Sequence, residues 1–262
     1  MADQMTFREL PDFLISRGRY WATTGEIAAQ TGAGSDATRH GLARLRSQRR
    51  LFTPARSFHV MVPPEYRSWG AVPAAWFIDP MMQHLGRDYY VGLLSAAAQH
   101  GASHQAAQIF QVVTDRHVEN RNFDRIRLRF QTSALAAQTP VEQVNTPTGT
   151  MAVSTREATV GDLVERPGKS GGLSNVATIL REIGELDGAE LARLSALRPR
   201  THARRLGWLL TKFRGDVETN SLRAVADPGK GAPIPLAAGG SSRGTVDEDW
   251  GVIVNTEVEP DI

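Results

Sequence analysis

Arginine is the residue type whose spacing most clearly indicates chemistry in this chain. Of 30 basic residues, only Lys169, Lys212 and Lys230 are lysine, and the other 27 are arginine. Residues 35–58 hold six arginines and one acidic residue, a net charge of +5. Arginine donates hydrogen bonds in pairs to phosphate oxygens and to guanine edges. The segment therefore predicts contact with a nucleic acid.

Helical periodicity sorts the side chains of residues 35–48. At 100° per residue, Thr38, Gly41, Leu42 and Leu45 share one arc, which must face other helices. The opposite arc would enter a major groove, with long donors on either side and further arginines holding phosphates. We expect base contacts from Arg39, His40 and Arg44, backbone proximity for Ser35 and Thr38, and phosphate contacts from Arg49, Arg50 and Arg56.

A second group of arginines lies near residue 200. Arg198, Arg200, Arg204 and Arg205 fall within eight residues. Such a cluster can be the solvated start of a helix, or a second basic patch. A patch would meet flanking DNA phosphates or an acidic partner surface. The sequence leaves both interpretations open.

A glycine-serine turn followed by acidic residues lies near the C-terminus. Residues 239–242 read Gly-Gly-Ser-Ser, and residues 247–249 read Asp-Glu-Asp. A nucleotidyltransferase uses such a turn for a phosphate and two acids for metal ions. The spacing of five residues is about half of what that site needs, so we expect a surface loop. An enzyme that transfers nucleotides with Gly239–Asp249 is kept as an alternative.

Two further motifs are weaker. His100 and His104 are four residues apart, but Gly101 interrupts the helix and no glutamate stands between them, so a metalloprotease signature is absent. Gly168, Lys169 and Ser170 resemble the end of a phosphate-binding loop whose upstream glycine is missing. We therefore predict no catalytic residue, no metal and no cofactor.

The elements that position the first arginines are short helices and a hairpin. Apolar periodicity predicts a helix over 6–17, and Thr23 with Glu26 forms a capping box for a second helix. Glycines at 32 and 34 make a turn, and Ser35 is the expected N-cap of a third helix that runs to about 48. Two β-rich runs within 49–62 follow. This order is typical of a winged helix-turn-helix.

The remaining chain has mixed character. We expect a buried helix over 88–99, strands at 109–113, 126–130, 150–154 and 250–255, and helices at 159–164, 173–186, 189–197 and 203–213. Residues 227–244 are rich in Gly, Pro, Ala and Ser and should form a surface connection. The predicted fold class is α+β, with a winged helix-turn-helix at 1–70 and a larger mixed α/β domain at 71–262.

Composition excludes several classes of protein. The chain has no cysteine, which excludes a disulfide scaffold, a cysteine nucleophile, an iron–sulfur cluster and Cys-ligated zinc. Its longest near-apolar run, 91–98, is far below the ~20 residues of a membrane helix. No leader segment is visible, and we expect a cytoplasmic protein without membrane contact. Residues 1–70 carry ten basic and six acidic residues, whereas residues 244–262 carry six acidic and no basic ones.

Five blocks occur in a familiar order behind the predicted winged head: 88–114, 146–164, 171–183, 204–210 and 250–262. They read DYYVGLLSAAAQHGASHQAAQIFQVVT, TPTGTMAVSTREATVGDLV, GGLSNVATILREI, RRLGWLL and WGVIVNTEVEPDI. The chain resembles the AbiEi-type antitoxins of type IV toxin–antitoxin systems, which belong to abortive-infection modules. One departure is Arg156-Glu157, where family members often have a proline-glutamate pair, so Glu157 receives no role here.

The resemblance implies two activities and two partners. The head would bind double-stranded operator DNA with inverted repeats and repress its own operon. The larger domain would neutralise a cognate nucleotidyltransferase toxin, either by direct binding or only functionally, without enzymatic activity. A plain winged-helix transcription regulator is the further alternative. The sequence leaves open the operator, the target of the toxin and the oligomeric state.

Overall fold

The computed structural model describes residues 5–102, 109–241 and 243–261, which form a mixed α+β fold. The chain divides into two compact units. The first contains Met1–Tyr90, Gln108–Ala137 and Gln143–Ala152, and the second contains Val91–Ala107, Gln138–Glu142 and Val153–Ile262. The boundary between a head and a larger domain, expected near residue 70, stays a prediction.

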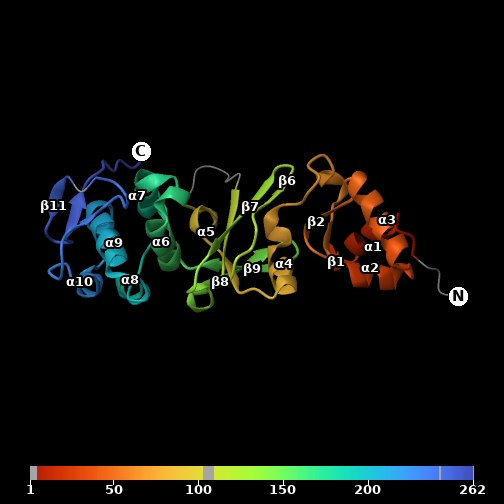
Figure 1. Ribbon diagram of the computed structural model, residues 1–262, viewed down its shortest axis with the longest axis horizontal. Coiled ribbons are helices and arrows are strands. Elements are labelled where there is room, and N and C mark those ends of the chain that lie inside the picture. The colour runs from red at the N-terminus through yellow and green to blue at the C-terminus, as the bar shows by residue number, and fades with distance from the viewer. Residues whose placement is uncertain (1–4, 103–108, 242, 262) are drawn as a thin grey trace. The chain divides into compact units, whose positions relative to one another are not determined.

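The N-terminal part of the first unit, residues 5–62, is called the head here. Its elements are α1 Leu10–Ser16, β1 Trp21–Thr23, α2 Thr24–Thr31, α3 Ser35–Ser47, β2 Leu51–Ala55 and β3 Phe58–Met61 (Figure 1). The three strands form an antiparallel sheet in the order β1-β3-β2, so β2 is an edge strand. The three helices pack together over an apolar core that includes Leu14, Ile27 and Leu45.

Local sequence explains where the head helices begin and end. The capping box predicted from Thr23 and Glu26 is present, with each side chain bonded to the other residue's backbone N–H. Gly32 ends α2 in the left-handed conformation, at φ 62°, where a residue with a side chain would be strained. The N-cap of α3 is Gly34 rather than Ser35, because the helical conformation already begins at Ser35.

A six-stranded sheet follows the head, and most of its residues belong to the first unit. Its strands, in the order β6-β7-β5-β4-β9-β8, are β6 Arg121–Phe123, β7 Ile126–Thr132, β5 Ile109–Thr114, β4 Tyr89–Val91, β9 Gly149–Ser154 and β8 Val141–Thr146. β5 and β7 pair in parallel over their full length, from Ile109 opposite Arg127 to Thr114 opposite Thr132. Helix α4, Ile78–Leu85, belongs to the same unit.

The expectation of a single buried helix over 88–99 was wrong. Residues 89–91 form the strand β4, and only α5, Leu93–Gln99, is helical. Gly92 separates them in a fully extended conformation, and Tyr89, Tyr90 and Val91 are residue types that favour strands. The strands expected at 109–113, 126–130 and 150–154 are present as β5, β7 and β9.

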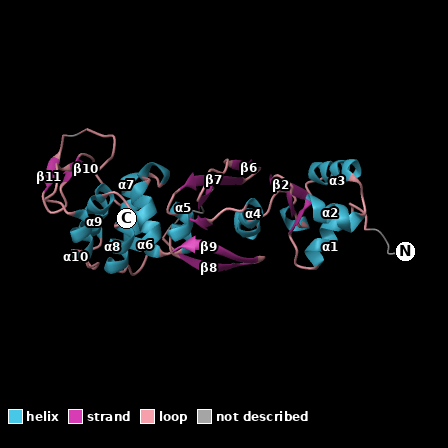
Figure 2. Ribbon diagram, turned by 60° about the horizontal axis from the view of Figure 1, so that its bottom comes forward, coloured by secondary structure: helices cyan, strands magenta, loops and turns pink. Residues whose placement is uncertain are grey.

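Helices dominate the second unit (Figure 2). After α5 they are α6 Arg156–Glu165, α7 Gly172–Glu182, α8 Gly188–Ser195, α9 Arg200–Phe213 and α10 Asn220–Ala226. A small sheet in the order β10-β12-β11 contains β10 Ile234–Pro235, β12 Val252–Val254 and β11 Thr245–Asp247. Helix α6 is central, because every residue from Ala158 to Val164 is buried.

Candidate nucleic-acid interface

Helix α3 has one buried and one exposed face. Its buried residues are Thr38, Gly41, Leu42 and Leu45, the same four that helical periodicity placed on the inner arc. The ring of Phe7 covers Gly41 so closely that no side chain would fit there without movement. This contact fixes α3 against the chain just before α1 and leaves the opposite face in solvent.

The exposed face of α3 carries most of the residues predicted to contact DNA. Ser35, Arg39, His40 and Arg44 are all exposed. Arg39 and Asp36 form an ion pair at 3.0 Å, with both side chains largely in solvent. An exposed pair of this kind is weak and exchanges readily for another anion. The guanidinium of Arg39 therefore remains available to a partner.

Two of the predicted contacts point elsewhere. Thr38 is buried, and its hydroxyl donates to the carbonyl of Ala33 at 3.4 Å, so it lies on the inner arc and away from any duplex. Arg50 donates to the carboxylate of Asp12 at 2.8 Å and to the carbonyl of Arg8 at 2.6 Å. Both residues hold the head together, and we withdraw them as DNA contacts.

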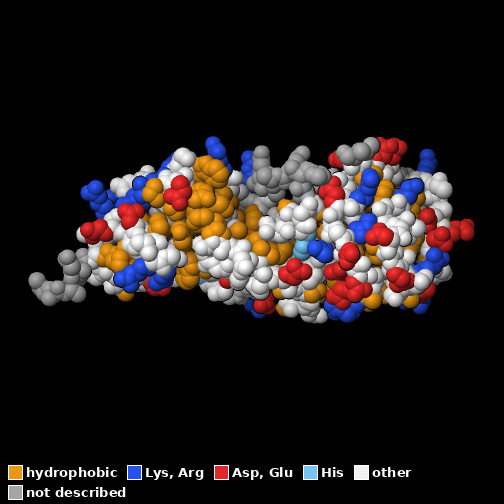
Figure 3. Space-filling model, turned by 180° about the vertical axis from the view of Figure 1, so that it is seen from behind, with side chains coloured by type: hydrophobic (Ala, Val, Ile, Leu, Met, Phe, Trp, Pro, Cys, Tyr) orange, Lys and Arg blue, Asp and Glu red, His pale blue; other side chains and the backbone are white. Residues whose placement is uncertain are grey.

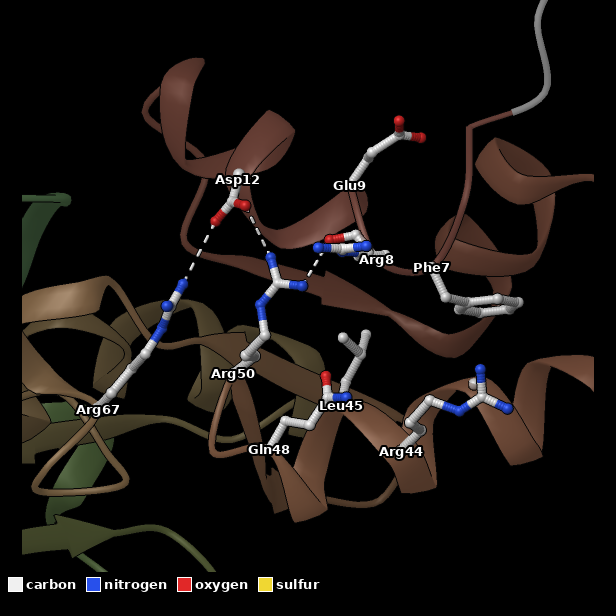
Figure 4. Close-up of a pocket in the computed structure, with 10 residues that line it drawn as sticks. Phe7, Arg8, Glu9, Asp12, Arg44, Leu45, Gln48, Arg50 and Arg67 are labelled. Carbon is white, nitrogen blue, oxygen red and sulfur yellow. Dashed lines mark hydrogen bonds and ion pairs between the residues drawn. The ribbon is translucent and has the colours of Figure 1, made fainter.

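Arg50 lies in a groove between α1 and α3 (Figure 4). The groove has a volume of about 740 Å³, and Asp12 at one end draws in both Arg50 and Arg67, the latter at 3.6 Å. Arg44 and Gln48 line its α3 side. The groove thus separates the structural arginine Arg50 from Arg44, whose side chain is exposed on the flank of α3.

The remaining predicted phosphate contacts lie on either side of β2. Arg49 forms an ion pair with Asp124 at 3.4 Å and donates to the carbonyl of Ser68, while about half of its side chain stays exposed. Arg56 and Ser57 form the two-residue tip of the β2–β3 hairpin, and Arg56 is exposed.

The backbone of this tip is bonded on both sides. The N–H of Thr24 donates to the carbonyl of Ser57 at 3.0 Å, and His84 Nε2 bonds the carbonyl of Arg56 at 2.9 Å. The hairpin is therefore short and fixed, and Arg56 supplies the long exposed side chain of its tip.

A buried histidine stabilises the hairpin and was not singled out by the sequence. The two ring nitrogens of His59 each bond a hydroxyl at 2.9 Å, that of Thr24 and that of Thr53. Burial, together with the nearby charges of Arg46 and His84, lowers the pKa of His59 to about 4. The imidazole is neutral near pH 7, and it ties β2 and β3 to the start of α2. Its place inside a strand gave no sequence signal for this role.

The arginines near residue 200, for which a second basic patch was one interpretation, are engaged in contacts within the second unit. Arg204 is buried, and its guanidinium donates to the backbone carbonyls of Ala226, Asp227, Pro228, Lys230 and Ala232. Arg198 is almost fully enclosed between Asp162 and Glu165, both at 3.1 Å. Both side chains therefore form hydrogen bonds or ion pairs inside the second unit.

The other two arginines of the group are also engaged within the second unit. Arg205 donates to the carbonyl of Pro235, and Arg200 pairs with Asp227 at 3.3 Å. On the face shown in Figure 3, acidic and basic side chains are interspersed over this end of the molecule. The cluster in the sequence therefore does not become a cluster of free charges.

The acidic segment of the alternative enzyme site is engaged in local contacts. Asp249 forms an ion pair with Arg223 at 3.1 Å, and the carboxylate of Asp247 accepts from the N–H of Trp250. Ser242 lies outside the described residues. Among residues 5–102, 109–241 and 243–261, no three His, Asp or Glu side chains gather closely enough to hold a metal ion.

The weaker motifs have structural places. His100 Nε2 bonds the carbonyl of Ser154 at 2.8 Å, and His104 lies outside the described residues. Residues 167–169 form a short 3-10 turn ahead of α7. In the part of the chain that the structure describes, every helix is too short or too polar to cross a lipid bilayer.

Comparison with known proteins finds a family similar to the middle of the chain. Residues 90–212 match the family model of the AbiEi antitoxin C-terminal domain. The resemblance to AbiEi-type antitoxins is therefore confirmed over this stretch, which is similar to the AbiEi antitoxin C-terminal domain. The match supports an antitoxin role in a toxin–antitoxin system.

A solved structure shares the fold. The crystal structure of the RV2827C protein from Mycobacterium tuberculosis superimposes with a TM-score of 0.69 at 13% sequence identity. The similarity covers 96% of this chain and 93% of that chain. No curated protein matches the sequence. At this identity the comparison describes the fold alone.

Proposed function

We propose that the chain is an antitoxin whose head is a winged helix-turn-helix that binds operator DNA and represses its own operon. The observation that carries this proposal is the exposed face of α3, which presents Arg39, His40 and Arg44 over a helix whose other face is buried. The order of helices and strands in the head supports it as well. The acidic partner would be the duplex, because a major groove accepts a helix of this width.

The contacts divide into two kinds. Arg39, His40 and Arg44 read base edges, since their side chains are long donors on the exposed face. Ser35 lies at the start of the helix, where its hydroxyl and the backbone N–H groups favour a phosphate. Arg49 and Arg56 hold phosphates on either side of β2. Inverted repeats require two copies of the chain, spaced by turns of the duplex.

Neutralisation of a toxin is the second part of the proposal. Its support is the AbiEi antitoxin domain at 90–212. We propose that the larger domain, at 71–262, counteracts a cognate nucleotidyltransferase of a type IV system, without itself catalysing a reaction. This action takes place in the cytoplasm, where the operon and its products meet. It could occur through direct binding or through an effect on what the toxin modifies.

Two assays test the proposal. A labelled fragment of the gene's own promoter should shift with the purified chain and show protection over inverted repeats, whereas an unrelated duplex of equal length should not. Co-expression of the chain with the product of the adjacent gene should restore growth. Specific DNA binding without growth rescue would reduce the protein to a transcription regulator. Rescue without DNA binding would remove the role of the head.

A further inference from the structure

Two sheet edges lie side by side in the first unit. β2 is an edge strand of the head sheet, and β6 is an edge strand of the six-stranded sheet. The rings of Phe52 on β2 and Phe123 on β6 are 5.2 Å apart, and both views of the fold place the strands close together (Figures 1 and 2). Strand β6 of the AbiEi domain thus lies against β2, the strand that Arg49 and Arg56 flank.

The segment that contains β6 is rich in arginine. Residues 116–129, called the arginine hairpin here, hold five arginines and two acidic residues. We propose that the arginine hairpin is a second DNA-binding element, which contacts phosphates beside those held by the head. This inference rests on the proposed function of the head and extends the DNA-binding surface into the AbiEi domain.

One end of the hairpin meets the tip of the head. Arg56 lines a cavity of about 250 Å³ together with Arg87, His117 and Arg121. The cavity has an apolar floor, to which the buried side chains of Met81 and Phe130 contribute. Basic side chains from three separate segments therefore line one opening, together with the acidic side chain of Glu119. A phosphate at this opening would be reached by donors from both the head and the AbiEi domain.

The other end of the hairpin meets the end of α3. Asp124 in the turn between β6 and β7 pairs with Arg49, two residues after α3 ends. The next residue, Arg125, lies over the ring of Trp69 at 5.5 Å. Gly70 permits this approach, because a side chain there would collide with the carboxylate of Asp124. The turn is thereby held beside the helix that we propose enters the major groove.

Each of the two acidic residues of the arginine hairpin forms an ion pair with an arginine. Glu119 accepts from Arg121 at 2.6 Å, and this bond lowers the pKa of Glu119. Glu119 is exposed, so its pairing with Arg121 is weak in water and competes directly with a phosphate for the same guanidinium. Replacing Glu119 by its neutral isostere should release Arg121 to DNA. The proposal thus predicts a gain of binding, which an unfolded variant cannot mimic.

Charge on an edge strand also has another known use. Arginines and lysines on an exposed edge prevent that strand from pairing with another molecule. If the arginine hairpin served only this purpose, removing its charges would promote aggregation and leave DNA binding unchanged. The same substitutions can therefore separate the two roles.

The experiment compares two exposed arginine–carboxylate pairs, one in the arginine hairpin and a bidentate one on α8. Glu119→Gln and Arg121→Gln alter the pair in the hairpin, and Glu190→Gln and Arg193→Gln alter a pair on α8 with the same 2.6 Å separation. Affinity of the full chain for its own promoter is measured over a series of salt concentrations. We expect Glu119→Gln to tighten binding roughly three- to tenfold at low salt and Arg121→Gln to weaken it by a similar factor. Arg121→Gln should also lower the salt slope by about 0.9.

The outcomes keep this inference apart from the proposal on which it rests. If Arg39→Ala weakens promoter binding while the Glu119 and Arg121 variants behave like the α8 controls, the arginine hairpin is not a DNA element. Aggregation of Arg121→Gln with unchanged affinity overturns the inference in favour of edge protection, and an effect on toxin neutralisation alone overturns it in favour of a protein partner. If the wild-type chain fails to bind its promoter at all, the proposed function itself falls.

Discussion

The ring of Phe7 lies against Gly41, in the middle of the third helix of the head. A residue with a side chain at position 41 would have to push this ring aside, and with it the chain that leads into α1. Because Gly41 sits on the same face as Leu42 and Leu45, the contact sets how closely α3 approaches its neighbours. Because Gly41 has no side chain, the ring of Phe7 can pack directly against α3. This packing fixes the position of the exposed face of the helix.

Gly41→Ala should therefore destabilise the head. Overpacking costs about 1–3 kcal/mol, and the better helix propensity of alanine offsets up to about 1 kcal/mol of that. We expect a net loss of about 1–2 kcal/mol in urea unfolding. Gly25→Ala is the matched control, since Gly25 lies in α2 with open space around it, and it should stabilise the protein slightly. Equal effects of the two substitutions would contradict the role given to Phe7.

The DNA contacts should separate into two kinds of variant. Arg39→Ala and His40→Ala should change which operator sequence is preferred, because they remove donors to base edges. Arg56→Ala should weaken binding to every sequence alike and reduce the salt slope by about one unit. Binding constants for the promoter, for point-mutated half-sites and for unrelated DNA distinguish these patterns. The same pattern from all three variants would show that the roles are assigned wrongly.

Stability should depend on pH through His59. Its folded pKa of about 4 lies below the value of about 6.5 in an unfolded chain, so the unfolded state takes up a proton first as the pH falls. The stabilisation is fully present above pH 6.5 and is lost as the pH falls to about 4, by about 3 kcal/mol in total.

Urea unfolding from pH 7.5 to 4 tests this dependence. His59→Gln removes the titrating group and should flatten the loss of stability over that range. His202 is the internal comparison, because burial lowers its pKa to about 4 as well, and it lies in the second unit. A wild-type stability that stays constant from pH 6.5 to 4 would contradict the assignment of a neutral buried imidazole.

Arg204 should prove to be a structural residue. Its guanidinium donates to five carbonyls of the stretch 226–232, and among these the carbonyl of Asp227 also accepts from the N–H of Lys230. Arg204→Ala removes all five bonds and a buried guanidinium from this site, and we expect a loss of about 3 kcal/mol. Arg204→Lys keeps the charge but has fewer donors and should recover only part of it. Arg205→Ala, which removes a single carbonyl bond, should cost far less in the same unfolding assay.

The parts of the fold that follow from local sequence were predictable. The inner arc of α3 and the capping box of α2 depend on residues three or four apart, and both predictions are confirmed. The structural roles of Thr38 and Arg50 were harder to predict. Thr38 was on the predicted inner arc but was also given a DNA contact, and these two statements cannot both hold. Arg50 bonds Asp12, 38 residues away, and no local pattern reveals such a partner.

The contacts of the cluster near residue 200 were not predictable for the same physical reason. A run of arginines specifies charge, but burial depends on which acceptors the fold brings to it. The carbonyls around Arg204 lie 22–28 residues further along the chain.

Short strands such as β6 and β11 have only three residues each, too few for a period-two pattern to stand out. Their existence depends on pairing with β7 and β12.

The β2–β3 tip, pinned by Thr24 and His84, has little freedom to swing toward a bound duplex. On the proposed function, adjustment must then come from the nucleic acid, which has to bend or change its groove width to meet Arg56. Base pairs that the protein never touches would influence affinity through their stiffness, with flexible pyrimidine–purine steps favoured where curvature is needed. Operators selected from random sequence should accordingly show preferences between the two half-sites as well as within them.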